Sequence, residues 1–399
     1  MSRRRAVSLA SLAVVVAVGV VPVVSLAAQS KVPSVTLSLP EIELEETFDR
    51  ISGLRELRDG RVVVTDVLAK SVALADFKAG TVTRIGREGS GPNEYQFPRS
   101  LVALPGDTTL VVDVMQRRFL RVLPDGTPSG TIAWPNEMGG VVTVKGADEQ
   151  GRIYFQGSAF SFGGGGGPAQ ISDRMPDTVP VLRWDRRTQK VDTIARVKGP
   201  NLGVNVSGGQ NNRSVTIRQQ PWSPQDDWSV TPQGAVGIVR VADYHVDWIS
   251  PTKQVTSGSK VPYAKVKVTE ADREEYLRRM RDPRGRMMMT DGGGGPRGGG
   301  GPAGARPPQP AEPQVDFPEE KPPFAEQSAM MTPDGQLWVR RSATVGTPTT
   351  YDVFDATGKH LRQVVLPKSA SVAGFGNGTV YVTRTDEDDL VYLGRYRRP

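Results

Sequence analysis

Two histidines and no cysteine limit the chemistry available to this 399-residue chain. Serine hydrolase chemistry needs a histidine oriented by a carboxylate and a nucleophile on a strained turn, but the chain has only His245 and His360 and no G-x-S-x-G motif. Without cysteine there are no disulfides, thiolate metal sites, cysteine nucleophiles or lipid-modified cysteine anchor. Each histidine is best interpreted as a packed or surface imidazole. We therefore identify no catalytic residue and no metal ligand, and the binding residues stay unknown.

In a glycine-rich segment, residues 86–91, the spacing of the glycines is a weak signal for a phosphate-binding loop. Such a loop needs a strand before it and a helix after it. Here Pro92-Asn93-Glu94-Tyr95 and another strand follow, so we interpret the segment as a turn between strands. The formal net charge is +7, and about +4 remains once the three N-terminal arginines are removed with the segment described next. This mild bias does not indicate nucleic acid binding.

The first 28 residues have the pattern of a secretory signal peptide. Arg3, Arg4 and Arg5 precede an apolar run over 6–28, which ends in small residues at Ser25-Leu26-Ala27-Ala28. We expect a signal peptide over 1–28 and a periplasmic or secreted mature protein with no membrane span. A retained anchor is the alternative, because the run is just long enough to cross a bilayer. The helix breakers within the run favour cleavage.

A polar turn containing glycine, followed by a β-rich strand, occurs six times. The turn glycines lie at 60, 106, 151, 234, 335 and 378, at intervals of 46, 45, 83, 101 and 43 residues. Three intervals match one blade of a β-propeller, about 40–50 residues, and the two long ones contain the most glycine-rich stretches. The pattern predicts an all-β, six-bladed β-propeller with four-stranded antiparallel blades over residues 34–399. A two-sheet sandwich or two β-domains would not explain a period near 45.

The same repeats predict how the ring closes and where it is interrupted. Only three strands fit in the last blade, so we expect residues 35–39 to supply the fourth and join the two ends of the ring. Insertions are expected at about 158–178 and 256–323. In the second, Thr269-Glu270-Ala271-Asp272 resembles a capping box and opens a short helix to Arg281, followed by a disordered Gly/Pro-rich loop. A lid over the central opening is the less favoured role for that helix.

Two segments resemble NHL-type propellers. Gly86-Arg87-Glu88-Gly89-Ser90-Gly91-Pro92-Asn93-Glu94-Tyr95, then Phe97-Pro98, is similar to the inter-blade phrase of that family, and residues 110–126 are similar to its blade. The whole resembles six-bladed propellers that bacteria export. The resemblance implies the fold and an extracytoplasmic setting, but no chemistry. Some NHL-related lyases hold a metal through several histidines, and this chain has too few.

We expect no cofactor, and calcium is the alternative. Lactonase-like six-bladed propellers hold a cation in the central channel through Asp, Glu and Asn side chains. Carboxylates in or beside the expected strands offer such oxygens: Asp66, Asp76, Asp113, Asp243 and Asp247. The acidic run over 386–389 is interpreted as a solvated connection.

The functional prediction is a monomeric binding or scaffolding module for an unidentified ligand or protein partner. The sequence favours a role without catalysis. Loops around the central depression of a propeller are where ligands or partners usually lie. The alternative is a calcium-dependent ester or lactone hydrolase.

Overall fold

The chain divides into two units, residues 1–31 and Val32–Pro399. A computed structural model describes residues 32–139, 143–157, 176–207, 214–281 and 315–399. The signal peptide predicted over 1–28, most of the first predicted insertion and about half of the second therefore lie outside the described residues. No helix in the described part of the chain is long and apolar enough to cross a membrane.

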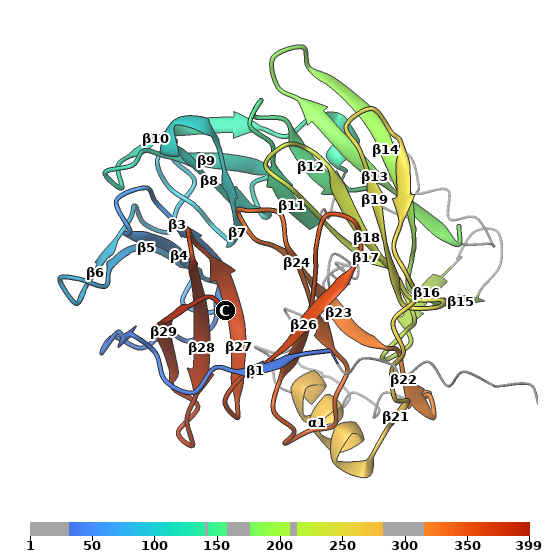
Figure 1. Cartoon of the computed structure of the whole chain (residues 1–399). Coiled ribbons are helices and arrows are strands. Elements are labelled where there is room, and N and C mark those ends of the chain that lie inside the picture. The colour runs from blue at the N-terminus through green and yellow to red at the C-terminus, as the bar shows by residue number, and fades with distance from the viewer. Residues whose placement is uncertain (1–31, 140–142, 158–175, 208–213, 282–314) are drawn as a thin grey trace, which may run out of the picture. The chain divides into compact units, whose positions relative to one another are not determined.

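Six sheets form the blades of a β-propeller, as the repeat predicted (Figure 1). From blade 1 to blade 5 the innermost strand of each blade contacts that of the next, and the innermost strand of blade 6 contacts that of blade 1. The strands named below pair antiparallel within each blade. From the innermost strand outwards, the blades are β3 (Ile51–Glu56), β4 (Val62–Asp66), β5 (Ser71–Asp76) and β6 (Thr81–Arg84) in blade 1; β7 (Pro98–Ala103), β8 (Thr109–Asp113), β9 (Arg118–Val122) and β10 (Pro128–Ala133) in blade 2; β11 (Thr143–Ala147), β12 (Ile153–Gln156), β13 (Thr178–Asp185) and β14 (Lys190–Lys198) in blade 3; β17 (Asp227–Val230), β18 (Val236–Arg240), β19 (His245–Ile249) and β20 (Val255–Ser257) in blade 4; β23 (Phe324–Met331), β24 (Leu337–Arg341), β25 (Thr350–Phe354) and β26 (His360–Val365) in blade 5; and β27 (Ala370–Phe375), β28 (Thr379–Thr385) and β29 (Val391–Arg397) in blade 6.

The turn that anchors the repeat has one backbone conformation in all six blades. Each of the six predicted turn glycines has a φ between 72° and 87°. Residues with a Cβ rarely adopt this left-handed conformation, whereas glycine does so at no steric cost. The turn between the first and second strands of each blade therefore requires glycine. For this reason the blade repeat can be recognised in the sequence from its turn glycines.

The core consists of six apolar clusters, one in each space between neighbouring blades. The cluster between blades 1 and 2 includes Val63 and Leu120, and the cluster that closes the ring, between blades 6 and 1, includes Val64 and Tyr381. Val63 and Val64 are adjacent on β4, and their side chains point to opposite faces of blade 1. Second strands such as β4 are buried on both faces, which explains their continuous rather than alternating apolar residues.

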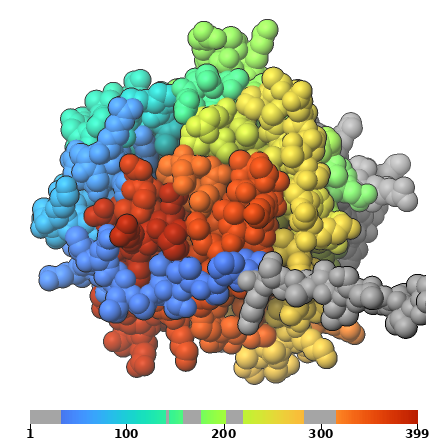
Figure 2. All heavy atoms as spheres, viewed as in Figure 1, coloured from blue at the N-terminus to red at the C-terminus, as the bar shows by residue number. Residues whose placement is uncertain are grey.

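The N-terminal segment closes the ring, but the strand that completes blade 6 is not the predicted one. β2 (Ile42–Glu43) pairs antiparallel with β29 and supplies the fourth strand of blade 6. Residues 35–39 were expected there, but β1 (Ser34–Thr36) instead pairs parallel with β26 as a fifth strand of blade 5. Figure 2 shows the segment that follows residue 32 crossing the outer surface of the last two blades. The difference arises because the N-terminal segment lies first along the outer edge of blade 5 and then along that of blade 6 before the chain enters blade 1.

The described part of the second insertion contains the predicted helix. α1 (Glu270–Arg281) begins with a capping box, in which Asp272 N donates to Thr269 Oγ1 at 3.3 Å and Thr269 N donates to Asp272 Oδ2 at 2.9 Å. A short pairing of β21 (Val266–Lys267) with β22 (Glu320–Lys321) brings the two ends of the insertion together. The hairpin β15 (Leu202–Ser207) and β16 (Ser214–Gln219), between blades 3 and 4, was not predicted. The predicted Gly/Pro-rich loop lies largely outside the described residues.

Candidate functional site

The longest connections between strands all leave the same end of the blades. In an antiparallel blade, connections from the second to the third strand, and from one blade to the next, lie at one end. Residues 157–177, 199–226 and 258–323 are such connections, because they follow β12, β14 and β20. We call this end the insertion face, and the opposite end, which carries the other hairpin turns, the turn face. Long loops held by a rigid scaffold commonly carry the function of a protein.

A buried ion pair joins three innermost strands near the insertion face. Lys145 on β11 places its Nζ 2.9 Å from Asp227 Oδ1 on β17, and the two side chains are only 12% and 8% exposed. The backbone N–H of Ala329, on β23, donates to Asp227 Oδ2 at 2.7 Å. A buried carboxylate needs such partners, because an unpaired charge in a low dielectric is costly. The pair thus links the innermost strands of blades 3, 4 and 5.

The innermost strand of blade 5 bulges beside this ion pair. Phe324 faces Arg341 and Ala329 faces Val339, so residues 325–328 lie opposite a single residue of β24. Within the bulge Gln327 is exposed and has a φ of 48°, the only left-handed non-glycine residue inside a described strand. The adjacent Ser328 is 2% exposed, and its Oγ has no hydrogen-bond partner among the described residues. Bulges, strained backbone and unpaired buried polar groups are concentrated at functional sites.

Helix α1 is anchored to blade 5 by a second buried ion pair. Lys321 Nζ lies 2.8 Å from Asp272 Oδ1, and these side chains are 5% and 0% exposed. Lys321 also donates to the carbonyl oxygen of Ala343, and Asp272 accepts from the backbone N–H of Val345, both in the turn after β24. Burial alone would raise the pKa of Asp272, but the hydrogen bonds from Lys321 and Thr269 outweigh it and hold that pKa below its usual value.

An aromatic cluster lies between α1 and the inner ring. Tyr276 on α1 contacts Trp222 and Phe317, with ring centroids 5.6 Å apart in each pair. Lys321 Nζ lies 5.0 Å from the centroid of Trp222, within cation–π range. The pKa of Tyr276 is raised, by burial first and then by the negative charge of Glu326 in the bulge.

We refer to Trp222, Tyr276, Phe317, Gln327 and Ser328 as the mouth cluster. It combines partly buried aromatic rings, the exposed Gln327 and the buried hydroxyl of Ser328, which has no hydrogen-bond partner among the described residues. These groups can bind a ligand through stacking and hydrogen bonds. Lys145 with Asp227 and Lys321 with Asp272 form neutral pairs nearby. Glu326 in the bulge and Arg273, which lies 5.8 Å from the Phe317 ring centroid, are further charges close to the cluster.

The aspartates considered as candidate calcium ligands do not converge. Asp66 and Asp113 end the second strands of blades 1 and 2, and each accepts backbone N–H groups from the connection entering its own blade, including those of Asp49 and Phe97. Asp76 accepts from the backbone of its own turn, at Lys78 and Ala79. These carboxylates are structural acceptors. No group of three or more potential metal-ligating side chains occurs in the parts of the chain that the structure describes.

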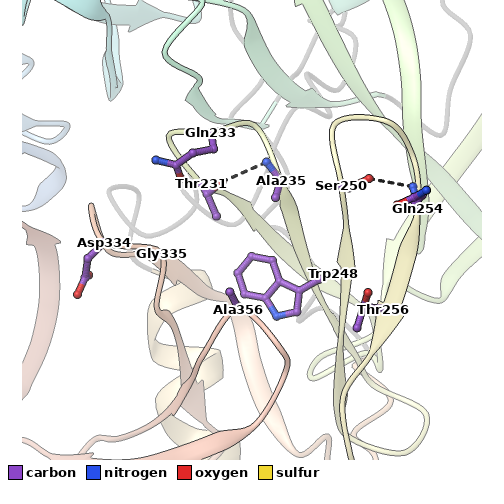
Figure 3. A pocket seen from close by; sticks show the side chains of 10 residues that line it. All are labelled: Thr231, Gln233, Ala235, Trp248, Ser250, Gln254, Thr256, Asp334, Gly335 and Ala356. Carbon is purple, nitrogen blue, oxygen red and sulfur yellow. Dashed lines mark hydrogen bonds between the residues drawn. The ribbon is translucent and has the colours of Figure 1, made fainter.

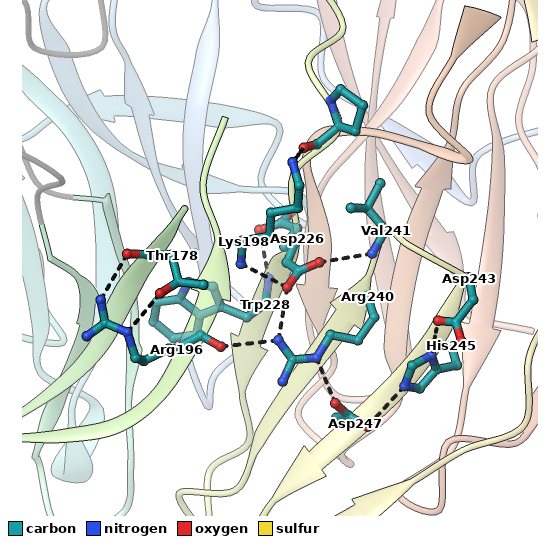
Figure 4. Close-up of polar contacts among 12 residues, drawn as sticks. Thr178, Arg196, Lys198, Asp226, Trp228, Arg240, Val241, Asp243, His245 and Asp247 are labelled. Carbon is teal, nitrogen blue, oxygen red and sulfur yellow. Dashed lines mark hydrogen bonds and ion pairs between the residues drawn. The ribbon is translucent and has the colours of Figure 1, made fainter. Parts of the chain in front are cut away.

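The other two predicted aspartates flank His245 in blade 4. The imidazole Nδ1 lies 2.5 Å from Asp243 Oδ1, and Nε2 lies 3.2 Å from Asp247 Oδ1. Arg240 donates to Asp247 at 2.7 Å and to Asp226 at 2.9 Å, extending the network to the connection from blade 3 (Figure 4). The hydrogen bond from Lys260, followed by that from His245, lowers the pKa of Asp243. His245 is therefore a packed imidazole within an inter-blade network.

His360 belongs to a buried polar contact between blades 4 and 5. Its ring stacks on Phe354 with centroids 5.2 Å apart, and its Nε2 lies 3.1 Å from Asp352 Oδ1. Tyr244 donates its hydroxyl across the blade boundary to Asp352, which is fully buried. Burial, and next the charge of Asp352, raise the pKa of Tyr244 well above its usual value. The histidine is packed, in the position that the sequence indicated.

The residues of the mouth cluster were not identified from the sequence. Trp222 and Phe317 are 95 positions apart, and Ser328 is one of many serines in the chain. Only the short helix that carries Tyr276 was predicted. The low-complexity connections on both sides were the available signal, because they predict where long loops leave the blades.

No family model matches the chain, and no curated protein matches it. Similar solved structures include a gluconolactonase from Xanthomonas campestris, at 11% identity and a TM-score of 0.42 over 90% of this chain and 95% of that one. Others are a putative exported protein from Bacteroides fragilis (12%, 0.46, 92% and 99%) and a virginiamycin B lyase from Staphylococcus aureus (13%, 0.39, 88% and 97%). Likeness at this level assigns no activity, and the NHL-type resemblance stays a prediction.

Proposed function

We propose that this chain is an exported binding module whose ligand or protein partner contacts the mouth cluster on the insertion face. One observation carries the proposal: the three longest connections and the bulge of β23 lie at the same end of the blades. Long connections and strained backbone do not stabilise a fold, so their presence at the same end of the blades supports a role in binding.

The chemistry of the mouth cluster supports recognition rather than catalysis. The hydroxyl of Ser328 is buried without a partner and so favours a bound group that supplies one. Gln327 presents an exposed amide held in a left-handed conformation by the bulge. The rings of Trp222, Tyr276 and Phe317 offer apolar contact area. Such a combination binds a partner that has both apolar and hydrogen-bonding groups.

Site-specific photocrosslinking tests this proposal in exporting cells. A photoreactive phenylalanine analogue replaces Gln327 or, as the control, Gln189. Both residues are exposed glutamines with positive φ, but Gln189 lies in a turn on the turn face. We expect discrete adducts from position 327 and none from position 189. Absence of adducts at 327, or equal adducts at both positions, would refute the assignment of the insertion face.

Export is a separate part of the proposal and rests on the pattern of residues 1–28. Sequencing the N-terminus of the mature protein tests it. A first residue near 29 is expected, and a chain that still carries residues 6–28 would support the retained anchor instead. We also propose that the mature chain is a monomer, and a sedimentation mass near twice that of one chain would contradict this.

The calcium-dependent hydrolase has no contact in its favour among the described residues. Its candidate ligands Asp66 and Asp113 already accept backbone N–H groups, and Asp247 accepts from Arg240 and Ser257. We therefore do not propose it.

A further inference from the structure

The turn between the first two strands of blade 6 contains the single Asn–Gly pair of the chain, Asn377-Gly378. It joins β27 to β28 on the turn face, and both residues are exposed. Two-residue hairpin turns favour this pair for its backbone conformation. The pair also has a chemistry of its own, because the backbone nitrogen of glycine can attack the side-chain amide carbon of the preceding asparagine without obstruction by a Cβ.

The two reacting groups of this turn are free of hydrogen bonds. The side-chain amide of Asn377 and the backbone N–H of Gly378 make none with any residue that the structure describes. In blades 1 and 5 the equivalent glycine, Gly60 or Gly335, donates its N–H to the carbonyl oxygen three residues earlier, at 3.0 Å in each turn. An exposed N–H without an acceptor loses its proton to hydroxide more readily than a bonded one, so the nucleophile forms most easily in blade 6.

Side chains stabilise the same turn in other blades. Figure 3 shows the turn of blade 4, in which Thr231 Oγ1 accepts from the backbone N–H of Ala235 at 3.1 Å. A threonine hydroxyl accepts in the same way in blade 5. In blade 6 the hydroxyl of Thr379 instead donates to Glu56 of blade 1, and the contact across the turn is a backbone bond from Gly376 N to Thr379 O at 3.1 Å. The blade 6 turn is therefore less constrained by its own side chains.

Asn377 also takes part in closing the ring. Its backbone N–H donates to Glu56 Oε1 of blade 1 at 2.9 Å. The backbone N–H of Arg398, which follows β29, donates to Gly378 O at 3.0 Å. A change in the main chain at this turn therefore alters the contact between the last blade and the first.

We propose that Asn377 is a site of spontaneous deamidation and that its isoaspartyl product weakens the closure of the ring. The nitrogen of Gly378, once hydroxide has removed its proton, forms a bond to Cγ of Asn377. The bond from Cγ to Nδ2 breaks, and ammonia leaves after taking a proton from water, so that a succinimide remains. Water then opens the succinimide: attack at Cγ gives aspartate, and attack at the main-chain carbonyl carbon gives isoaspartate, in which the peptide chain runs through Cγ.

Isoaspartate changes the turn in two ways that act against the bond to Glu56. It adds one methylene to the main chain of a two-residue turn. It also leaves a free carboxylate on Cα of residue 377, next to the N–H that Glu56 accepts. Two negative charges at this separation repel each other.

Ageing the mature chain in mildly alkaline buffer tests the site. Peptide mass spectrometry measures the mass gained when the amide is replaced by a carboxyl group, and a protein isoaspartyl methyltransferase identifies the isoaspartate. Asn93 and Asn136 are the internal controls, because both are exposed and each precedes a glutamate. We expect conversion at Asn377 to be more than about tenfold faster than at either control. Equal rates at the three positions, or no conversion at Asn377, would overturn the assignment.

A matched variant tests the effect on the ring. Asn377→Gln keeps a side-chain amide and the backbone bonds of the turn, but its cyclisation needs a six-membered ring and is much slower. Fresh Asn377→Gln should unfold in urea at the midpoint of the fresh parent, which confirms that it folds. After ageing, the parent should acquire a second population whose midpoint is lower by about 0.5 M, and the variant should not.

Glu56→Ala links this loss to ring closure. Because the variant lacks the carboxylate that Asn377 contacts, aged and fresh Glu56→Ala should unfold at nearly the same midpoint. The effect on the ring is refuted if parent protein rich in isoaspartate unfolds like fresh protein, if aged Asn377→Gln loses as much stability, or if ageing destabilises Glu56→Ala as much as the parent.

Discussion

Glu56 is expected to hold the first and last blades together, and its removal provides a quantitative test of ring closure. The carboxylate lies at the end of β3 in blade 1 and accepts three hydrogen bonds from blade 6. These come from Asn377 N at 2.9 Å, Thr379 Oγ1 at 2.6 Å and Tyr381 OH at 2.5 Å. Its neighbour Arg55 points to the opposite face of the strand and bonds to Thr109 in blade 2.

The expected loss of stability follows from these contacts. A hydrogen bond to a charged group contributes about 1.5–3 kcal/mol, and bonds that share one carboxylate are not additive. Because Glu56 is half-buried, water replaces part of the loss, so we expect Glu56→Ala to lower the free energy of unfolding by about 3 kcal/mol. With a urea m-value of about 3 kcal/mol/M, the unfolding midpoint should fall by about 1 M.

A double-mutant cycle with Gly376 makes the test specific. A Cβ at Gly376 would lie 2.0 Å from Glu56 Oε2, so Gly376→Ala must displace the carboxylate. We expect Gly376→Ala to destabilise the parent strongly and the Glu56→Ala variant much less. Glu88→Ala is the control, since Glu88 forms an exposed pair with Lys70 and should cost less than about 0.5 kcal/mol. Urea unfolding followed by tryptophan fluorescence measures all five proteins. Additive effects, or a Glu56→Ala variant as stable as the parent, would refute the reasoning.

Three further predictions concern other buried contacts. Lys321→Met leaves the buried Asp272 carboxylate without its cation, so hydrogen exchange should become faster in α1 while the blades keep their protection; unchanged exchange in α1 would show that the ion pair does not anchor the helix. Burial, and next the charge of Asp148, raise the pKa of Tyr154 to about 12. Since this value exceeds the usual 10, the stability contribution is complete below pH 10 and is lost as the pH rises through 10 to 12. Tyr154→Phe should therefore reduce the fall in urea midpoint over that range, and an equally steep fall would contradict the assignment. Asp113→Ala should cost about 2–4 kcal/mol, because it leaves several backbone N–H groups of blade 2 without an acceptor, whereas Asp76→Ala in an exposed turn should cost less than about 1 kcal/mol in the same unfolding assay.

The repeat could be predicted because its signal is local. A left-handed turn position requires glycine whatever surrounds it, and Gly60 and Gly335 meet that requirement in blades far apart in sequence. The start of α1 was predictable for a similar reason, since Thr269 and Asp272 bond to each other within one turn. The prediction that residues 35–39 form the fourth strand of blade 6 was wrong about which residues form that strand. Two N-terminal segments have strand character, and the outer edge on which each one lies depends on the path of the chain across blades 5 and 6.

The amino-acid sequence by itself determined the fold and the number of blades. These features depend on turn geometry and on runs of apolar residues that act over a few positions. Only the tertiary structure decided which polar groups meet. Lys145 and Asp227 are 82 residues apart, and Asp66, a candidate metal ligand on residue type, accepts backbone N–H groups instead. The physical reason is that a side chain's chemistry depends on its desolvation and its partners, and in a ring of blades those partners come from distant parts of the chain.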